Sequence, residues 1–416
     1  MLGIDFGTSN SAAAIVLSDG SLCPIALDAD QNAMPTALYF DGGPVRFGSA
    51  ALQGYLNEND AGSGRLVRGL KSLLGSRLMN EQTLLQGRMT SFFDIVVLFL
   101  HEIRTRAEQQ LGHAVEGVML GRPVHFVDDD AARDALAQAN LERDAHAAGF
   151  AQVRFHLEPV AAAFDYQRRI ARDSTVLVVD IGGGTSDFSV MRLGQRRQPG
   201  QPGGAEVLAT SGVHLGGTNF DQLLNLRCVM PLMGLGHLGA RGREVPASVF
   251  FDLSTWHLIH QAYSRKQLHH AAELRSFYAD PQLHQRLMLV LQQRQGHRLL
   301  ALVEAAKISC SDSAAPAGID LGSIEPALGA PLTPALLAET LALQVGKIAN
   351  CARRCVAASG VGAPDLLYLA GGSSALVPLV AALQAIFPQA TVVEGDRAGG
   401  VAAGLAWHGA SLDGHA

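Results

Sequence analysis

The feature that most constrains the fold is a short pattern that occurs twice, near the start of the chain and near its middle. An apolar segment runs into an aspartate, a glycine turn and hydroxyl residues, and a second apolar segment follows. The copies are Asp5-Phe6-Gly7-Thr8-Ser9 and Asp180-Ile181-Gly182-Gly183-Gly184-Thr185-Ser186. Because the second copy opens a similar series of segments, the repeat predicts duplication, with two similar lobes that face each other.

The length and composition fit two lobes. The chain has 416 residues, of which 48% are hydrophobic and 17% charged. That length suits two lobes of about 150–200 residues each. The formal net charge of −6 argues against a nucleic-acid partner. The sequence shows no signal peptide and no apolar run of about 20 residues, and its five cysteines are scattered. We therefore expect a cytoplasmic protein that is not membrane-bound.

Apolar runs and helical periodicities alternate along the chain and predict an α/β architecture. Helices are expected over Ser91–Leu111, ending at Gly112, and from Asp128 to about Ala148, with a mostly helical stretch over residues 223–309 and a loop over residues 195–204. The expected strands are Leu2–Asp5, Ala12–Leu17, Leu22–Leu27, Gly117–Leu120, Val153–Phe155, Thr175–Asp180, Phe188–Leu193, Glu206–Gly212 and Leu366–Ala370.

The chemistry of the two glycine turns suits a polyphosphate and its metal ion. Glycine permits a tight turn and a close approach of backbone to ligand. Consecutive N–H groups and hydroxyls then form an anion-binding concavity, and the aspartate can hold Mg²⁺ through water. Two matched turns would grip opposite sides of one polyphosphate. A third turn, Gly371-Gly372-Ser373-Ser374, follows a strand and can lie flat against a nucleoside.

These motifs and their order resemble the nucleotide-binding domain of the DnaK-type 70-kDa heat-shock chaperones. The matching segments are Gly3–Ser11, Glu158–Ala163, Asp180–Asp187, His214–Asp221, Leu369–Ser373 and Gly395–Leu405. The resemblance implies an actin-like ATPase fold, with two lobes that each contain a ribonuclease H-like core and a nucleotide cleft between them. We expect lobe I over residues 1–172 plus 391–416, with an upper subdomain at about 29–111, and lobe II over residues 173–390, with a mostly helical upper subdomain at about 219–315.

The same resemblance implies ATP or ADP and Mg²⁺ as ligands. Asp5 and Asp180 would orient Mg²⁺ through water, Glu158 would position the attacking water, and Lys71 would lie beside the γ-phosphate. Thr185 joins this catalytic set. The other expected nucleotide contacts are Gly7, Thr8, Ser9, Asn10, Gly182, Gly183, Gly184, Gly216, Gly217, Glu304, Lys307, Ser311, Gly371, Gly372, Ser373 and Asp396.

Two departures from the family pattern affect the expected function. Ile308 and Ala375 occupy the positions of the arginines that sandwich adenine, so we expect weaker ATP binding, by about tenfold or more, or an altered base preference. The sequence stops at Ala416 without a peptide-binding domain, a pattern similar to the short YegD-type members of the family.

The resulting prediction is a slow, Mg²⁺-dependent ATPase, a molecular chaperone or partner-regulating ATPase that acts on or with a protein partner or client. Three other functions remain open on the same residues. The alternatives are a small-molecule kinase such as a sugar kinase, an actin-like filament or scaffold protein, and a sensor that binds nucleotide without hydrolysing it.

Overall fold

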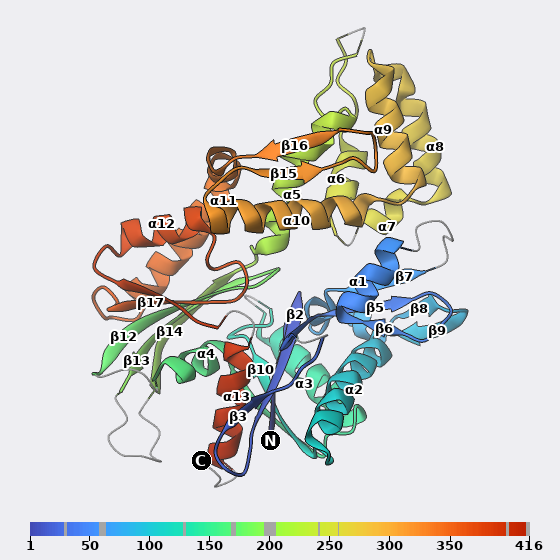
Figure 1. Cartoon of the computed structure of the whole chain (residues 1–416). Coiled ribbons are helices and arrows are strands. Elements are labelled where there is room, and N and C mark those ends of the chain that lie inside the picture. The colour runs from blue at the N-terminus through green and yellow to red at the C-terminus, as the bar shows by residue number, and fades with distance from the viewer. Residues whose placement is uncertain are drawn as a thin grey trace.

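Two mixed β-sheets with the same strand order form the centre of the molecule (Figure 1). The computed structural model describes all residues except 29–30, 58–63, 128–129, 168–171, 195–204, 240–241, 257, 397–398 and 413–416. The loop expected over residues 195–204 and the expected start of a helix at Asp128 therefore lie outside the described residues.

The first sheet has the order β11-β10-β1-β2-β3, and β4 also pairs with β2. The second has the order β14-β13-β12-β17-β18. In each, three antiparallel strands are followed by two parallel ones, so the topology confirms the predicted duplication. The strands are β1 (Leu2–Phe6), β2 (Asn10–Val16), β3 (Leu22–Pro24), β4 (Ala33–Pro35), β10 (Gly117–Arg122), β11 (Gln152–Leu157), β12 (Ser174–Ile181), β13 (Ser186–Leu193), β14 (Ala205–Val213), β17 (Leu366–Ala370) and β18 (Thr391–Glu394).

Strand β12 shows why the central strands are apolar along their length. Leu177, Val179 and Ile181 face the large core of the second half of the chain, whereas Val176 and Val178 face a separate core on the other side of the sheet. Side chains alternate between the faces of a strand, and both faces of this sheet are covered. A continuous apolar run therefore marks a central strand here.

Helices cover both sheets. Helix α2 begins after a capping box formed by Ser91 and Asp94 and ends at Gly112, whose φ of 75° is left-handed, as the sequence predicts. Helix α13 packs against β1, β2 and β10. The helices that contact the sheets or each other at this level are α2 (Phe92–Leu111), α3 (Ala131–Ala147), α4 (Glu158–Gln167), α5 (Gly217–Leu224), α11 (Pro334–Ala358), α12 (Val377–Ile386) and α13 (Gly400–Leu412).

Two smaller groups of elements lie above the sheets in Figure 1. We call residues 37–91 the first cap and residues 225–332 the second cap. The first cap contains β5 (Ala37–Phe40), β6 (Arg46–Phe47), α1 (Gly48–Asn57), β7 (Arg65–Arg68), β8 (Gln82–Leu85) and β9 (Arg88–Ser91). The second cap contains α6 (Ser248–Ser254), α7 (Ile259–Ala262), α8 (Arg265–Glu273), α9 (Pro281–Gln292), α10 (Gly296–Ser313), β15 (Ala317–Asp320) and β16 (Gly329–Leu332). The mostly helical character predicted for residues 223–309 is confirmed.

Two predicted boundaries differ from the structure. The strand expected over Leu22–Leu27 ends at Pro24, because the chain then turns and the Leu27 N–H donates to the Gln31 carbonyl at 3.1 Å. Residues 391–394 form β18 and pair with β17 in the second sheet, although they were expected in lobe I. We therefore propose that the chain returns to the first lobe only between β18 and α13.

Asp144 on α3 is a carboxylate buried without a hydrogen bond. Its side chain is 0% exposed, and neither oxygen has a hydrogen-bond partner among the residues that the structure describes. The Arg143 guanidinium lies 3.6 Å from Oδ1, which is too long for a hydrogen bond. Burial raises the pKa of Asp144 to about 7, and Arg143 opposes the shift only in part.

We expect Asp144→Asn to stabilise the protein at pH 8. The folded-state pKa lies above the unfolded value of about 3.9, so the free energy of unfolding of the wild type falls as pH rises through this window. The variant lacks this dependence and should be more stable by on the order of 2 kcal/mol at pH 8 but not at pH 4. Urea unfolding at both pH values measures this, with Glu142→Gln on the same helix as control. An equal difference between Asp144→Asn and wild type at both pH values would contradict the prediction.

Candidate functional site

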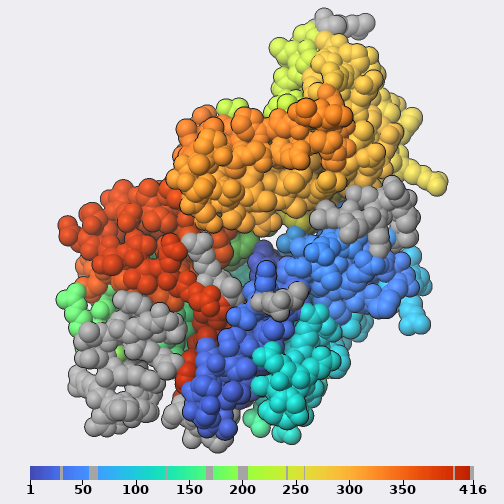
Figure 2. Space-filling model, viewed as in Figure 1, coloured from blue at the N-terminus to red at the C-terminus, as the bar shows by residue number. Residues whose placement is uncertain are grey.

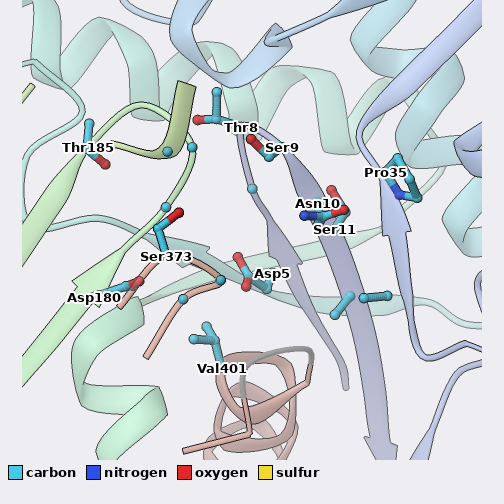
Figure 3. A pocket seen from close by; sticks show the side chains of 18 of the residues that line it. Asp5, Thr8, Ser9, Asn10, Ser11, Pro35, Asp180, Thr185, Ser373 and Val401 are labelled. Carbon is cyan, nitrogen blue, oxygen red and sulfur yellow. The ribbon is translucent and has the colours of Figure 1, made fainter. Parts of the chain in front are cut away.

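A cavity of about 400 Å³ lies between the two sheets and the two caps. Figure 3 shows how its labelled side chains face one another, with Asp180 and Thr185 on one side and Asn10 and Pro35 on the other. Most of the residues predicted from the sequence line it: Asp5, Gly7, Thr8, Ser9, Asn10, Lys71, Glu158, Asp180, Gly182, Gly183, Thr185, Gly217, Glu304, Lys307, Gly371, Gly372, Ser373 and Asp396.

Two hydrogen bonds from Thr36 stabilise the first glycine turn, between β1 and β2. The Thr36 hydroxyl donates to the Gly7 carbonyl at 2.8 Å, and the Thr36 N–H donates to the Ser9 carbonyl at 2.8 Å. Thr36 is fully buried, so these bonds are shielded from water. Thr36 was not predicted as a site residue, because a lone threonine between apolar residues belongs to no recognisable motif.

The second glycine turn, between β12 and β13, is held in the same way by the start of α5. The Gly217 N–H donates to the Gly182 carbonyl at 3.0 Å. The Thr218 N–H and hydroxyl both donate to the Gly183 carbonyl, at 2.8 and 2.7 Å. These carbonyls are therefore already bonded, which reduces the repulsion that they would exert on a phosphate.

The two glycine turns touch each other across the cleft. A side-chain carbon on Gly183 would overlap the Ser9 hydroxyl, so glycine permits this close approach without displacing Ser9. Thr8 of the first turn also lies close to Gly184 of the second. Two segments about 175 residues apart in sequence therefore present their N–H groups and hydroxyls to one space, as the repeat predicts.

Four charged groups meet at the floor of the cavity. Lys71, in a short 3₁₀ helix over Leu70–Leu73, donates from Nζ to Glu158 Oε1 at 2.6 Å, and their side chains are 11% and 10% exposed. Burial and the Glu158 charge raise the pKa of Asp5 to about 8. The same two causes raise the pKa of Asp180 to about 7. Burial lowers the pKa of Lys71, but Glu158 and Asp5 outweigh it and the net shift is upward.

The raised pKa values of Asp5 and Asp180 indicate that this cluster favours the binding of positive charge. Three carboxylates face one ammonium group, so the cluster has an excess of negative charge and retains protons above the usual pH range of an aspartate. A cation with a preference for oxygen ligands would replace those protons. Asp5 and Asp180 therefore fit the predicted role of holding Mg²⁺.

The opposite wall is formed by α10 and the turn after β17. Lys307 Nζ donates to Asp221 Oδ1 at 2.7 Å, and both side chains are buried. Gly371 has a left-handed φ of 74°, and a side-chain carbon there would overlap Asp180, so this turn also requires glycine. Ile308 and Ala375 occupy the two positions at which the family pattern has arginine. Ile308 lines the cavity, whereas Ala375 does not.

Three predicted contact residues do not line the cavity. Gly184 belongs to the second turn and lies beside Thr8 of the first turn, and Gly216 packs against the Gly183 backbone. The Ser311 hydroxyl instead accepts a hydrogen bond of 3.1 Å from the Val377 N–H at the start of α12. Ser311 lies one turn beyond Lys307 on the same face of α10, outside the cavity lining, and joins α10 to α12.

Sequence comparisons agree with this geometry. The chaperone protein DnaK of Ureaplasma urealyticum is 32% identical over 228 residues, which cover 54% of this chain and 34% of the relative. DnaK of Thermosipho melanesiensis is 31% identical over 225 residues, which cover 53% of this chain and 34% of the relative. The model of the Hsp70 protein family matches residues 1–230. The chain belongs to the Hsp70 family.

Membership of the Hsp70 family accounts for the two repeated sheets, since it implies the actin-like ATPase fold. The matched region covers only about a third of the length of the curated relatives, 34% in each case. None of the described helices is long and apolar enough to span a membrane.

Arg68 and Trp256 are among the residues of this Hsp70-family chain that line the cavity without having been predicted. Arg68 comes from β7 of the first cap, and Trp256 follows α6 in the second cap. The Arg68 guanidinium carbon lies 4.1 Å from the centre of a Trp256 ring. Sequence reasoning had no means to pair them, because they are distant in the chain and neither belongs to a glycine motif.

Proposed function

We propose that this protein binds ATP and Mg²⁺ between its two lobes and hydrolyses the ATP slowly, as a cytoplasmic member of the chaperone family that acts on or with a protein partner. The observation that carries the proposal is the Lys71–Glu158 pair beside Asp5 and Asp180. It lies in one cavity with both glycine turns, which suits the positioning and charge stabilisation that phosphoryl transfer requires.

Each group then has a distinct role. The two glycine turns hold the phosphates through N–H groups and the hydroxyls of Thr8, Ser9 and Thr185. Asp5 and Asp180 would hold Mg²⁺, which would supply positive charge to offset the negative charge of the phosphates. Lys71 stabilises the charge that develops on the γ-phosphate. Glu158 holds the attacking water and is itself oriented by Lys71.

The base would lie against α10 and the turn at Gly371 and Gly372. Glu304 and Lys307 from α10 would contact the ribose. Ile308 offers no cation to stack on the base, so we propose a weaker grip on adenine than in relatives that have arginine there.

We expect slow phosphate release from ATP that requires Mg²⁺, together with direct binding of ADP. The measurements are phosphate release from the purified chain with and without a Mg²⁺ chelator, and calorimetric titration with ATP, ADP and GTP. A folded protein that binds nucleotide but releases no phosphate would be a sensor and not an ATPase. If ATP and ADP do not bind at all, the proposed function is wrong.

A further inference from the structure

A second cavity of about 210 Å³ adjoins the first and separates the two caps. Leu52, Tyr55 and Leu66 from the first cap form one wall, and His297 and Ala301 on α10 form the other. Arg68 and Trp256 border both cavities, so the two spaces are continuous. In Figure 1, α10 (orange) passes above the blue first cap, and Figure 2 shows the blue and orange surfaces next to each other at this level.

Three rings make the second cavity strongly aromatic. The centre of the His297 ring lies 4.8 Å from that of Trp256 and 5.0 Å from that of Tyr55. The Tyr55 hydroxyl and His297 Nδ1 are hydrogen-bonded at 2.8 Å across the caps. Burial lowers the pKa of His297 to about 3 and raises that of Tyr55 to about 12, so both side chains are neutral at neutral pH. The rings therefore provide stacking surface without charge.

Arg68 is the cation that faces these rings. Its guanidinium stacks on Trp256, but it makes no hydrogen bond or close ion pair within the part of the chain that the structure describes. Burial lowers the pKa of Arg68, and the charges of Glu304 and Asp221 offset this only from a distance. A guanidinium has five N–H donors. Asn10 and Glu304 also line this cavity, but among the described residues neither is hydrogen-bonded to the guanidinium. Its N–H donors are therefore open to an acceptor on a ligand.

We infer that the second cavity binds a planar aromatic ligand that carries a negative charge. The ring packs against the cluster formed by Trp256, Tyr55 and His297, and the anionic group accepts hydrogen bonds from Arg68. Aromatic walls favour a planar ring over an aliphatic chain, and a charge-assisted bond to arginine favours a carboxylate, sulfonate or phosphate on it. Since the ligand contacts both caps, it would also slow their separation. This site adjoins the nucleotide cavity and shares Asn10 and Glu304 with it, but its occupation does not require a bound nucleotide.

N-Methylanthranilate is a suitable probe, because it is a planar aromatic carboxylate whose absorption overlaps tryptophan emission. The chain has two tryptophans, and Trp407 on α13 lies in a different core region. In the Trp407→Phe background, Trp256 is the only donor for energy transfer. We expect saturable energy transfer to the probe, and we expect Arg68→Met to weaken its affinity at least about tenfold.

Two further variants keep the test sharp. Arg65→Met removes an exposed arginine from the same strand and should leave the affinity unchanged. Ala301→Met fills the second cavity from the opposite wall and should also weaken probe binding, whether or not Arg68→Met folds well. Equal affinity in the Arg65, Arg68 and Ala301 variants, or no saturable transfer, would overturn the inference.

Calorimetric titration with ADP in the same samples separates this inference from the proposed function. Probe and ADP that bind together support both. Competition between them would place the probe in the nucleotide cavity and contradict the second site. ADP binding without probe binding would support the proposed nucleotide site and reject the second ligand site. Probe binding without ADP binding would support the second ligand site and reject the nucleotide site.

Discussion

Lys71→Met is expected to lower the rate of phosphate release at least about 100-fold while ADP still binds. Among the described residues, Lys71 is the one cation that bonds directly to the floor carboxylates, through Glu158 at 2.6 Å. Its removal takes away a preorganised charge that acts on the transition state, and a single group of this kind is worth about 10²–10³ in rate. Single-turnover phosphate release with enzyme in excess over ATP measures the effect.

The appropriate control is Lys266→Met, which removes an exposed lysine from α8 far from the cavity. Thermal unfolding with ADP present shows whether Lys71→Met remains folded and liganded, since Glu158 is left unpaired. A rate within about threefold of wild type in a folded, ADP-binding variant would exclude the proposed role of Lys71.

Lys307→Met is expected to destabilise the protein by about 3 kcal/mol. The Lys307–Asp221 pair is almost fully buried, with side chains 7% and 3% exposed. Loss of the lysine leaves a buried carboxylate without its counter-charge. Burial already raises the pKa of Asp221 to about 6 with Lys307 present, so the pKa should rise further without it. A raised folded-state pKa costs stability as pH increases, and the loss should be larger at pH 8 than at pH 5.

Urea unfolding of the single variant and of the double variant Lys307→Met with Asp221→Leu measures this prediction. The double variant removes both charges and should recover much of the lost stability. Lys347→Met, at an exposed position on α11, serves as the matched control. A double variant as unstable as the single one would show that packing around Lys307, and not its charge, holds α10 to α5.

The fold was largely predictable because its strongest signals are local. An apolar run followed by aspartate and glycine predicts a strand and a tight turn wherever it lies, and both copies form the expected hairpins. Helix α2 begins and ends where Ser91 and Gly112 predict, since the cap residues themselves bond or adopt a left-handed φ. The pairing of β18 with β17 was not predicted, because a four-residue strand carries no local signal for the sheet that it joins.

The candidate site was predictable where its residues belong to repeated motifs. Asp5 and Asp180 follow from the pattern, and Lys71 and Glu158 follow from the family resemblance. Thr36 was missed because it supports the first turn from beneath, through bonds to backbone carbonyls. Ser311, which was expected to contact the nucleotide, lies outside the cavity lining and bonds to the start of α12, a long-range contact that no local pattern shows.

Two similar α/β lobes, the positions of their glycine turns, and the acids Asp5 and Asp180 that precede those turns could all be predicted from the sequence. Strand patterns and turn chemistry act over only a few residues, so a local pattern is enough to reveal them. Only the tertiary structure decided that the two turns touch, that Arg68 stacks on Trp256, and that a second aromatic cavity opens beside the first. These features join segments that are far apart in the chain. They depend on how the caps pack, which no local pattern specifies.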